Sequence, residues 1–313
     1  MKLRKISFVL LLAVSVGTAS EAWAAHKPTP MATAAPGAVS IAIVDPADGV
    51  SLGANRTNVR GTFQGPLNTG ITVNGRIAYA SSGNFMLNAL PLVEGSNTIA
   101  AIATSPAGES AAATVAVSSL GAAPDLVLHA DVTGGSSPLL VTFTYDLRSR
   151  HPVKKLAIDF DGDGRDDFST NEPPSAVQSA YTHGGLYAAT LTVTDRSGHV
   201  HKAGAAIQVT SGDMRDSLFH SVWNSMTASL ARRDITTALQ SLNARAREKY
   251  APIFNELSSD LPAIVASYSN PQFVTERPGY LEYAVARPID GETKIFLVHL
   301  LRDADGVWRM DSF

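Results

Sequence analysis

The chain of 313 residues is predicted to be a multidomain protein in which two all-β sandwiches precede an α+β domain of helices and then an antiparallel meander sheet. Its length suits two or three domains at roughly 100–150 residues each. From residue 39 to about residue 210, short alternating apolar runs are separated by turn residues, as in antiparallel sandwiches. From Asp213 onward the apolar period changes from two to about 3.6, which indicates helices.

The first 24 residues have the pattern of a secretory signal peptide: a basic start, an apolar stretch from Ile6 to Val16, and a small-residue end at Ala22-Trp23-Ala24. We expect cleavage after Ala24. An uncleaved anchor is the weaker alternative, because the apolar stretch is shorter than the roughly 20 residues that span a bilayer. Residues 25–38 are rich in Pro, Ala and Thr and are expected to form a disordered or extended linker. The mature protein should therefore be exported, periplasmic or extracellular, and not membrane-spanning.

Charge and cysteine content exclude several classes of function. Lys and Arg number 25 against 28 Asp and Glu, a formal charge of −3, and removal of the predicted signal with its net +2 leaves −5. No basic cluster is present, so nucleic acid is not an expected partner. The chain has no cysteine, which excludes disulfides, thiol nucleophiles and thiolate metal sites.

Residues 39–118 are expected to form the first sandwich. Asn74-Gly75, between two apolar runs, is the strongest hairpin signal in the chain, because both turn positions need positive φ. The segment resembles a bacterial immunoglobulin-like module of the kind found beside polysaccharide-degrading enzymes and in surface proteins. The residues that carry this resemblance are turn or core positions and imply no ligand: Asp45 to Gly49 (DPADG), Val73 to Gly75 (VNG), Phe85 and Glu94 to Ile99 (EGSNTI).

Residues 124–210 are expected to form the second sandwich, and they resemble a PKD repeat. Four elements occur in the order of that family: a Pro138-Leu139 opening with the run LVTFTYDL, the acidic run IDFDGDGRDDF, the YTHGGLY corner and the closing run TLTVTDRSGH. One residue departs from the family pattern. Ile158 stands where an aromatic residue normally precedes the Asp-Phe pair, so the packing beneath the acidic turn should differ.

The acidic run within this second segment has the spacing of a calcium loop, D-x-D-x-D-G-x-x-D, in which Gly164 allows a sharp turn. Alternate carboxylates and one backbone carbonyl can then converge on a hard cation. The predicted ligands are Asp159, Asp161, Asp163, Asp167 and the carbonyl of Arg165. Position 12 is Thr170 rather than the bidentate Glu of an EF-hand, so a solvated acidic turn without metal remains the alternative.

Residues 213–313 are expected to form the α+β domain and to fold on their own. One helix carries a stripe from Leu218 to Leu230, a second is capped by Asp234 and extends to Tyr250, and Pro252 is placed at the start of a short third helix. A further turn or two of helix should follow Asp260. Strands are expected at QFVTE, YLEYAVARP, TKIFLVHLLR and VWRMDSF, joined by Pro-Gly and Asp-Gly turns.

This last segment resembles the nuclear-transport-factor-2-like cone fold, in which helices cover one face of a curved sheet and enclose a pocket. The resemblance rests on Asp234 to Leu239, Arg247 to Phe254 and Arg302 to Arg309. That family includes both enzymes and plain binding domains, so the resemblance alone does not imply a reaction.

Catalytic patterns are mostly missing from the sequence: there is no G-x-S-x-G, H-E-x-x-H, phosphate-loop or dinucleotide motif. His199 and His201 share a predicted strand face, but no third nitrogen ligand can be placed with them. Asp216 and His220 lie four residues apart on a helix and are expected to be exposed partners. His299 could line a pocket with Tyr283 or Trp308, although a core histidine without a second titratable partner is the preferred interpretation.

We therefore expect an exported, non-enzymatic modular binding, adhesion or scaffold protein with an unidentified protein or glycan partner. One alternative is an enzyme or small-ligand binder that uses the cone pocket, which a buried acid/base pair in the C-terminal domain would indicate. The other is a carbohydrate-binding accessory chain of a polysaccharide hydrolase, which would need an exposed row of aromatic residues on a sandwich face. Aromatic residues make up only 7% of the chain, which disfavours that row.

Overall fold

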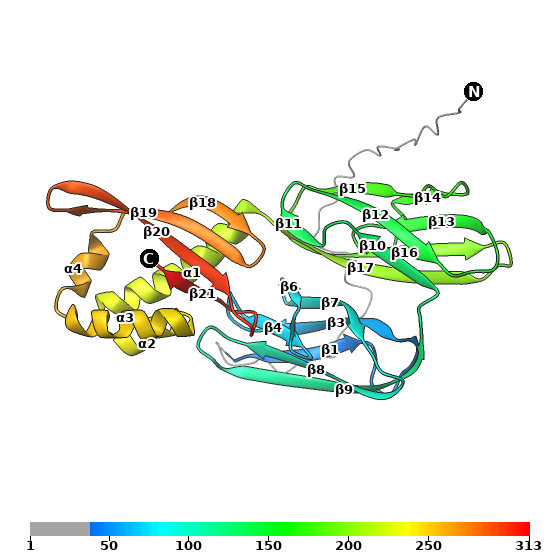
Figure 1. The fold of residues 1–313 in the computed structure, drawn as a ribbon, viewed down its shortest axis with the longest axis horizontal. Helices are drawn as coiled ribbons and strands as arrows, with labels where there is room; N and C mark the ends of the chain where they lie inside the picture. Colours follow the sequence, from blue (N-terminus) through cyan, green and yellow to red (C-terminus); the bar gives the residue numbers. More distant parts are fainter. Residues whose placement is uncertain (1–37) are drawn as a thin grey trace, which may run out of the picture.

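The computed structural model describes residues 38–313, and it is mostly β-structure with a smaller helical part near the C-terminus (Figure 1). The predicted signal peptide and all but the last residue of the predicted linker lie outside the described residues. Four sheets form two sandwiches, and a fifth sheet belongs to the C-terminal domain. In the described part of the chain, no helix combines the length and apolar character needed to cross a membrane.

The first sandwich contains nine strands in two sheets, ordered β1-β3-β7-β6 and β2-β9-β8-β4-β5. Buried residues from both sheets, among them Val59, Ile71, Phe85 and Ile99, form one apolar core. The strands are β1 (Ser40–Asp45), β2 (Ser51–Ala54), β3 (Arg56–Gln64), β4 (Gly70–Val73), β5 (Arg76–Ile77), β6 (Tyr79–Ser81), β7 (Asn84–Pro91), β8 (Gly95–Thr104) and β9 (Ser110–Ala122).

The predicted Asn74-Gly75 hairpin joins β4 to β5. Both turn residues have positive φ, 46° and 74°, as a two-residue hairpin turn requires. The Asn74 side chain also binds the neighbouring strand β8, because its Nδ2 donates to the carbonyl of Thr98 (3.0 Å) and its Oδ1 accepts from the N–H of Ala100 (2.7 Å). The turn is therefore fixed to the sheet as well as to its own strands.

The second sandwich pairs a three-stranded sheet, β10-β12-β15, with a five-stranded sheet, β11-β17-β16-β13-β14. Ile158 is buried in its core and pairs with Leu191, while the ring of Phe160 lies 5.5 Å from that of Phe143. The aromatic ring under the acidic turn thus comes from Phe160. The strands are β10 (Leu126–Ala130), β11 (Gly134–Ser136), β12 (Leu139–Leu147), β13 (Val153–Asp159), β14 (Phe168–Thr170), β15 (Val177–Tyr181), β16 (Gly185–Asp195) and β17 (Val200–Thr210).

The C-terminal domain packs four helices against an antiparallel meander sheet in the order β18-β19-β20-β21, which agrees with the predicted order of elements. Its core joins Phe219, Trp223 and Met226 of α1 to Tyr283 and Val298 of the sheet. The elements are α1 (Gly212–Ala231), α2 (Ile235–Gln240), α3 (Ala244–Glu256), α4 (Leu261–Ala266), β18 (Gln272–Arg277), β19 (Tyr280–Ile289), β20 (Glu292–Arg302) and β21 (Trp308–Ser312).

The predicted helix boundaries were wrong between Asp234 and Pro252. The single helix expected there is divided, because the segment between α2 and α3 pairs with β21: the N–H of Met310 donates to the carbonyl of Ser241 and the N–H of Asn243 donates to the carbonyl of Met310, both at 2.9 Å. Asn243 then caps α3 by accepting from the N–H of Ala246. Pro252 lies inside α3 rather than at the start of another helix.

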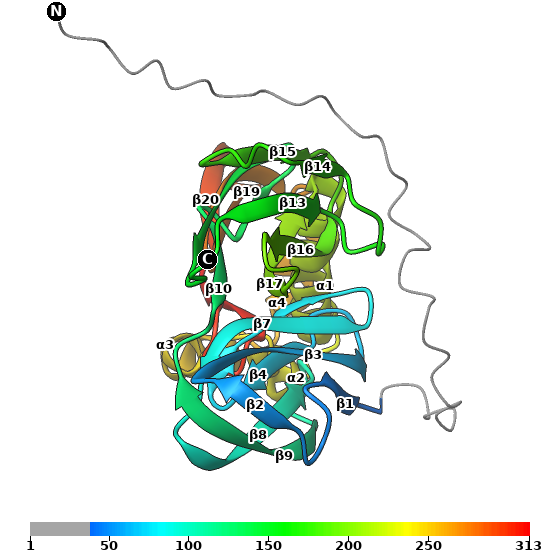
Figure 2. The same ribbon diagram turned by 90° about the vertical axis from the view of Figure 1, so that its right-hand side faces the viewer.

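The two sandwiches lie against each other (Figure 2), and side-chain hydrogen bonds from Asn58, Asn88, Tyr79 and Gln208 join them. Asn88 pairs reciprocally with the backbone of Ala206: its Nδ2 donates to the carbonyl (3.0 Å) and its Oδ1 accepts from the N–H (2.7 Å). Asn58 donates to the carbonyl of Gly204 at 2.8 Å. A small apolar cluster centred on Met86 and Ala188 fills the contact beside them.

The first sandwich also contacts the C-terminal domain directly. Asn68 pairs reciprocally with the backbone of Trp308, with both bonds at 2.8 Å. Arg302 donates to the carbonyl of Ala78 at 3.0 Å. At Gly70 the two backbones approach so closely that a Cβ atom would lie 2.4 Å from the carbonyl oxygen of Asp305.

The second sandwich passes into the C-terminal domain without a linker. β17 ends at Thr210, Ser211 caps α1 by accepting from the N–H of Met214, and α1 begins at Gly212. Gly184 packs so tightly on this junction that a Cβ atom would lie 2.4 Å from the Met214 sulfur. Each of the three parts therefore contacts the other two.

Gly70→Ala is expected to separate the first sandwich from the C-terminal domain, because the new methyl group overlaps the Asp305–Gly306 backbone. Overpacking of this kind costs about 1–3 kcal/mol. Hydrogen exchange in residues 302–308 should accelerate, and the radius of gyration should increase. Gly53→Ala, where a Cβ atom meets nothing within 4 Å, is the matched control. Equal exchange in both variants would show that the contact does not depend on this close approach.

Candidate functional site

The acidic loop connects β13 to β14 in the second sandwich. Asp159 is the last residue of β13 and is buried, whereas Asp161 and Asp167 are exposed. The Asp159 carboxylate accepts from the backbone N–H groups of Gly162 (2.7 Å) and Gly164 (2.8 Å). Both glycines have positive φ, 83° and 87°, so the loop can fold back on Asp159 without strain.

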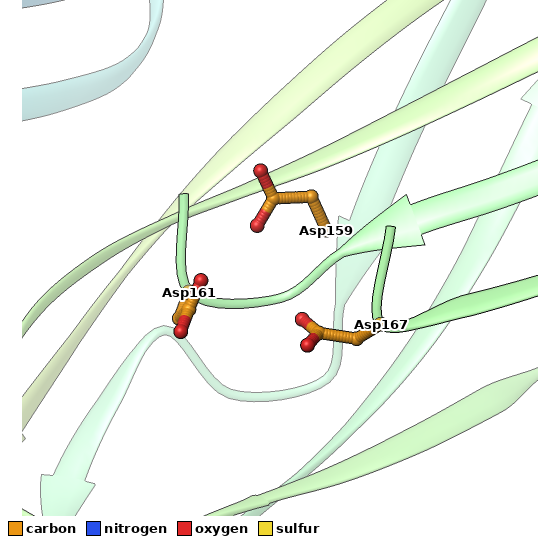
Figure 3. Close-up of side chains that lie close together, drawn as sticks. All are labelled: Asp159, Asp161 and Asp167. Atoms are coloured by element: carbon orange, nitrogen blue, oxygen red, sulfur yellow. The ribbon is translucent and has the colours of Figure 1, made fainter. Parts of the chain in front are cut away.

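Three of the four predicted carboxylates meet in this loop. One oxygen from each of Asp159, Asp161 and Asp167 lies within 4.8 Å of the others, and Figure 3 shows the three side chains gathered at the turn. Asp163 is not part of this cluster; its carboxylate accepts from the N–H of Arg165 at 2.7 Å, as that of Asp161 accepts from the N–H of Asp163 at 3.0 Å. The carbonyl of Arg165 stays a predicted ligand. Carboxylate oxygens are the donors that a hard cation such as calcium prefers.

The electrostatics of the cluster disfavour full ionisation. Although Asp161 is largely exposed, partial desolvation in the loop raises the pKa of its carboxyl group above the ordinary value, and the nearby carboxylates of Asp163 and Asp159 raise it further. Burial likewise raises the pKa of Asp167, with added repulsion from Asp161. A cation or a proton would relieve the same repulsion.

His199 and His201 are organised around a carboxylate rather than around a third nitrogen. Asp195 is 1% exposed and accepts from the hydroxyls of Ser197 (2.5 Å) and Ser149 (2.9 Å). It also accepts from the N–H of His199 (3.1 Å), and the His201 ring lies 3.5 Å away. The Ser197 hydrogen bond is the main reason that the pKa of Asp195 is lowered. These contacts close the β16–β17 turn.

Asp216 and His220 lie four residues apart on α1 as expected, and 44% of the Asp216 side chain is exposed, but the Asp216 carboxylate is bound mainly by other residues. Asp216 accepts from the hydroxyl of Tyr283 and from Arg215 (3.1 Å), whose guanidinium lies 3.5 Å above the ring of Phe273. The carboxylate is thus used to fix α1 to the sheet. His220 instead lines an open cleft between α1 and α4.

His299 was expected to have no titratable partner, and this was wrong. Its Nδ1 lies 2.7 Å from the hydroxyl of Ser312, and its Nε2 lies 3.1 Å from a carboxylate oxygen of Glu282, at ion-pair distance but outside hydrogen-bond geometry. The hydroxyl of Tyr280 donates to the same Glu282. Glu282, His299 and Ser312 are neighbours on the adjacent strands β19, β20 and β21. The pairing register of these strands could not be predicted from the sequence.

Comparison with known families identifies one segment. The family model for domain B of glucodextranase matches residues 40–119, which is nearly the whole first sandwich. No curated protein sequence matches the chain.

Several solved structures are similar to parts of the chain. The fibronectin(III)-like modules of Clostridium thermocellum CbhA align with 56% of this chain and 96% of their own at 11% identity and a TM-score of 0.24. The PKD1 domain of the Vibrio cholerae metalloprotease PrtV aligns with 27% of this chain and 95% of its own at 29% identity and a TM-score of 0.21. Dimeric latent PorU from Porphyromonas gingivalis aligns with 55% and 20% at 12% identity and a TM-score of 0.32. Because these TM-scores are low, the sandwich architecture rests on the strand pairing described above.

Asp161→Asn is expected to raise the melting temperature of the chain at neutral pH in chelator. A raised pKa in the folded state means that the ionised carboxylate destabilises the fold at neutral pH, and this effect fades as the pH falls toward the unfolded value near 3.9. Calorimetric melts at pH 7 and at pH 4 measure the difference, which should be largest at pH 7. Asp166→Asn, outside the cluster, should give no such gain. An equal gain in both variants would attribute the effect to net charge.

Proposed function

We propose that the chain is an exported, non-enzymatic modular binding or scaffold protein. In this proposal two immunoglobulin-like sandwiches, the second of them PKD-like, hold a nuclear-transport-factor-2-like domain in a fixed orientation. The single observation that supports it most is the reciprocal pairing of the first sandwich with both other parts, through Asn88–Ala206 and Asn68–Trp308. A rigid frame is suited to presenting a binding surface at a defined distance and angle. Export is supported by the pattern of residues 1–24.

The family match favours one form of this function. The matched model is named for a domain of glucodextranase and covers residues 40–119. A role as a carbohydrate-binding accessory chain beside a polysaccharide hydrolase is therefore the glycan-directed version of the proposal. A protein partner, as in adhesion, is the other version.

We further propose that the second sandwich holds a structural calcium ion at the acidic loop. Asp159, Asp161 and Asp167 would hold the ion, because their oxygens converge and are hard donors. The ion would supply positive charge that offsets the mutual repulsion of the carboxylates. The backbone bonds from Gly162 and Gly164 to Asp159 orient one carboxylate before any ion binds.

Calcium is expected to raise the melting temperature of the mature chain. Extracellular sites of this kind bind at about 10⁻⁴ to 10⁻³ M, so a 100-fold excess over the dissociation constant adds about 2.7 kcal/mol. Asp161→Ala should abolish the shift, because it removes one of the three converging carboxylates. Asp163→Ala should retain most of it, because Asp163 lies outside the cluster. The same melting temperature in chelator and in about 10–100 mM calcium, the 100-fold excess, would identify the loop as a solvated acidic turn.

A second candidate function is supported by the Ser312–His299–Glu282 arrangement. A hydroxyl, an imidazole and a carboxylate in sequence are the components of an activated serine nucleophile. The enzymatic alternative would be indicated by a buried acid/base pair, and the His299–Glu282 pair is half-buried, with 28% of the His299 side chain and 16% of the Glu282 side chain exposed. The proposal stays non-enzymatic because the Nε2 atom of His299 makes no hydrogen bond within the described residues, so Glu282 does not orient the imidazole as an activated nucleophile requires.

A binding experiment with a chemical readout tests the proposed function. The mature chain is applied to a glycan array and used in a pull-down from the native envelope, and every bound ligand is analysed for chemical change. Saturable binding without change is expected. The mature chain is also treated with a fluorophosphonate serine probe. Labelling that Ser312→Ala removes, or turnover of a bound ligand, would replace the proposal with the enzymatic alternative.

A further inference from the structure

The C-terminal domain contains an open cleft between the middle of α1 and the segment that joins α4 to β18. Its volume is about 480 Å³, within the roughly 300–1,000 Å³ of small-molecule sites. α1 contributes His220, Trp223 and Asn224 to the lining, and the segment after α4 contributes Tyr268 and Asn270. The site is separate from the acidic loop and from the Ser312–His299–Glu282 arrangement, since no residue is shared.

The floor of the cleft is aromatic. Trp223 is 5% exposed, and the ring of Tyr268 meets it edge to face at 5.4 Å. Within residues 38–313 the indole N–H of Trp223 has no hydrogen-bond partner. The nitrogen atom nevertheless keeps some contact with solvent. An almost completely buried side chain that lines the cleft therefore carries a donor without a partner among the described residues.

The rim of the cleft is polar and uncommitted. The side chains of His220, Asn224 and Asn270 make no hydrogen bond to any other described residue, and both asparagines are exposed. Each carboxamide offers donors and an acceptor. Burial raises the pKa of Tyr268, opposed by nearby Arg287, so its hydroxyl stays protonated at neutral pH.

The chemistry of this lining selects its ligand. No Lys, Arg, Asp or Glu is among the described residues that line the cleft, although Arg287 lies beside Tyr268 and Asp216 beside His220. Because the lining itself carries no such charge, an uncharged ligand is favoured over an ionic one. A purely apolar ligand would cover the amides and the indole N–H without hydrogen bonds, which is costly. An uncharged molecule with many hydroxyl groups and an apolar face fits this lining. Its hydroxyl groups can bond the polar side chains, and its apolar face can pack on the aromatic rings.

We propose that this cleft binds a neutral oligosaccharide, with Asn224, Asn270 and the Trp223 indole N–H bonding its hydroxyl groups and Tyr268 contacting a sugar ring. The inference rests on the proposed binding function and names its ligand class. Because the cleft is open rather than enclosed, it accommodates a chain segment, and a hexasaccharide should bind more tightly than the free monosaccharide.

Tryptophan fluorescence provides a reporter at the site itself. The chain has three tryptophans, Trp23, Trp223 and Trp308, of which the first lies in the predicted signal peptide. In the mature chain carrying Trp308→Phe, Trp223 is the remaining emitter. Titration with maltohexaose, isomaltohexaose, cellohexaose and chitohexaose should give a saturable change with at least one of them, and hexagalacturonate should give none.

Two exposed substitutions and a matched control locate the binding. Asn224→Ala and Asn270→Ala should each weaken affinity about three- to tenfold, as expected for one lost hydrogen bond. Asn255→Ala, an exposed asparagine on α3 away from the cleft, should leave the affinity unchanged. Because all three side chains are exposed, the fold should survive each change, which circular dichroism checks.

Each result leads to one conclusion. If a neutral glycan binds and neither cleft variant weakens it, the cleft assignment is wrong while the binding function stands. If only hexagalacturonate binds, or no glycan in the panel does, the ligand class is wrong and a protein partner remains under the proposed function. If a bound hexasaccharide is cleaved, the non-enzymatic function fails even where the cleft variants weaken binding.

Discussion

Asparagine side chains that pair with the backbone of a different part of the chain are the interaction on which the arrangement of the molecule depends. Asn68 and Asn88 each give one donor and one acceptor to a single residue, Trp308 or Ala206, as a neighbouring strand would. Backbone groups at these edges would otherwise need water or another partner. The apolar cluster between the sandwiches has only three buried members, so it supplies little direction. Directional polar pairs, together with the close approach at Gly70, therefore set the orientation of the three parts.

Most helices, strands and turns could be predicted from local sequence patterns, because turn residues and apolar periodicity determine these elements directly. Asn74-Gly75 forms its turn through the positive φ that both residues tolerate. The change of apolar period after Asp213 predicted the helices and the meander in their correct order. The division of the helix after Asp234 could not be predicted in this way. It depends on backbone bonds between Ser241, Asn243 and Met310, and Met310 lies on a strand far along the chain. Likewise, no pattern marks Asn58, Asn68 or Asn88 as contacts between parts.

The candidate sites likewise divide into one that local spacing predicts and others that depend on contacts between distant parts of the chain. Spacing brought Asp159, Asp161 and Asp167 together because one short loop carries all three. Spacing also included Asp163, which lies outside the cluster of three, although its carboxylate accepts a backbone N–H, that of Arg165, as the other three carboxylates of the loop do. Glu282, His299 and Ser312 meet only through the register of three strands, which the sequence does not state. The cleft beside Trp223 depends on where the segment around Tyr268 settles against α1, a matter of tertiary packing.

Two strand pairs have a mechanical consequence. β2 runs parallel to β9, and β11 runs parallel to β17, so in each sandwich an early strand lies beside the last one and points the same way. Tension that draws the beginning of a sandwich away from its end pulls these neighbours in opposite directions along their length. Their hydrogen bonds are then loaded together in shear instead of opening one after another. Resistance to pulling is set by the rate of forced unfolding rather than by equilibrium stability. The parallel register of each sandwich thus means that a pull on its two ends must shear this set of hydrogen bonds rather than open them in sequence.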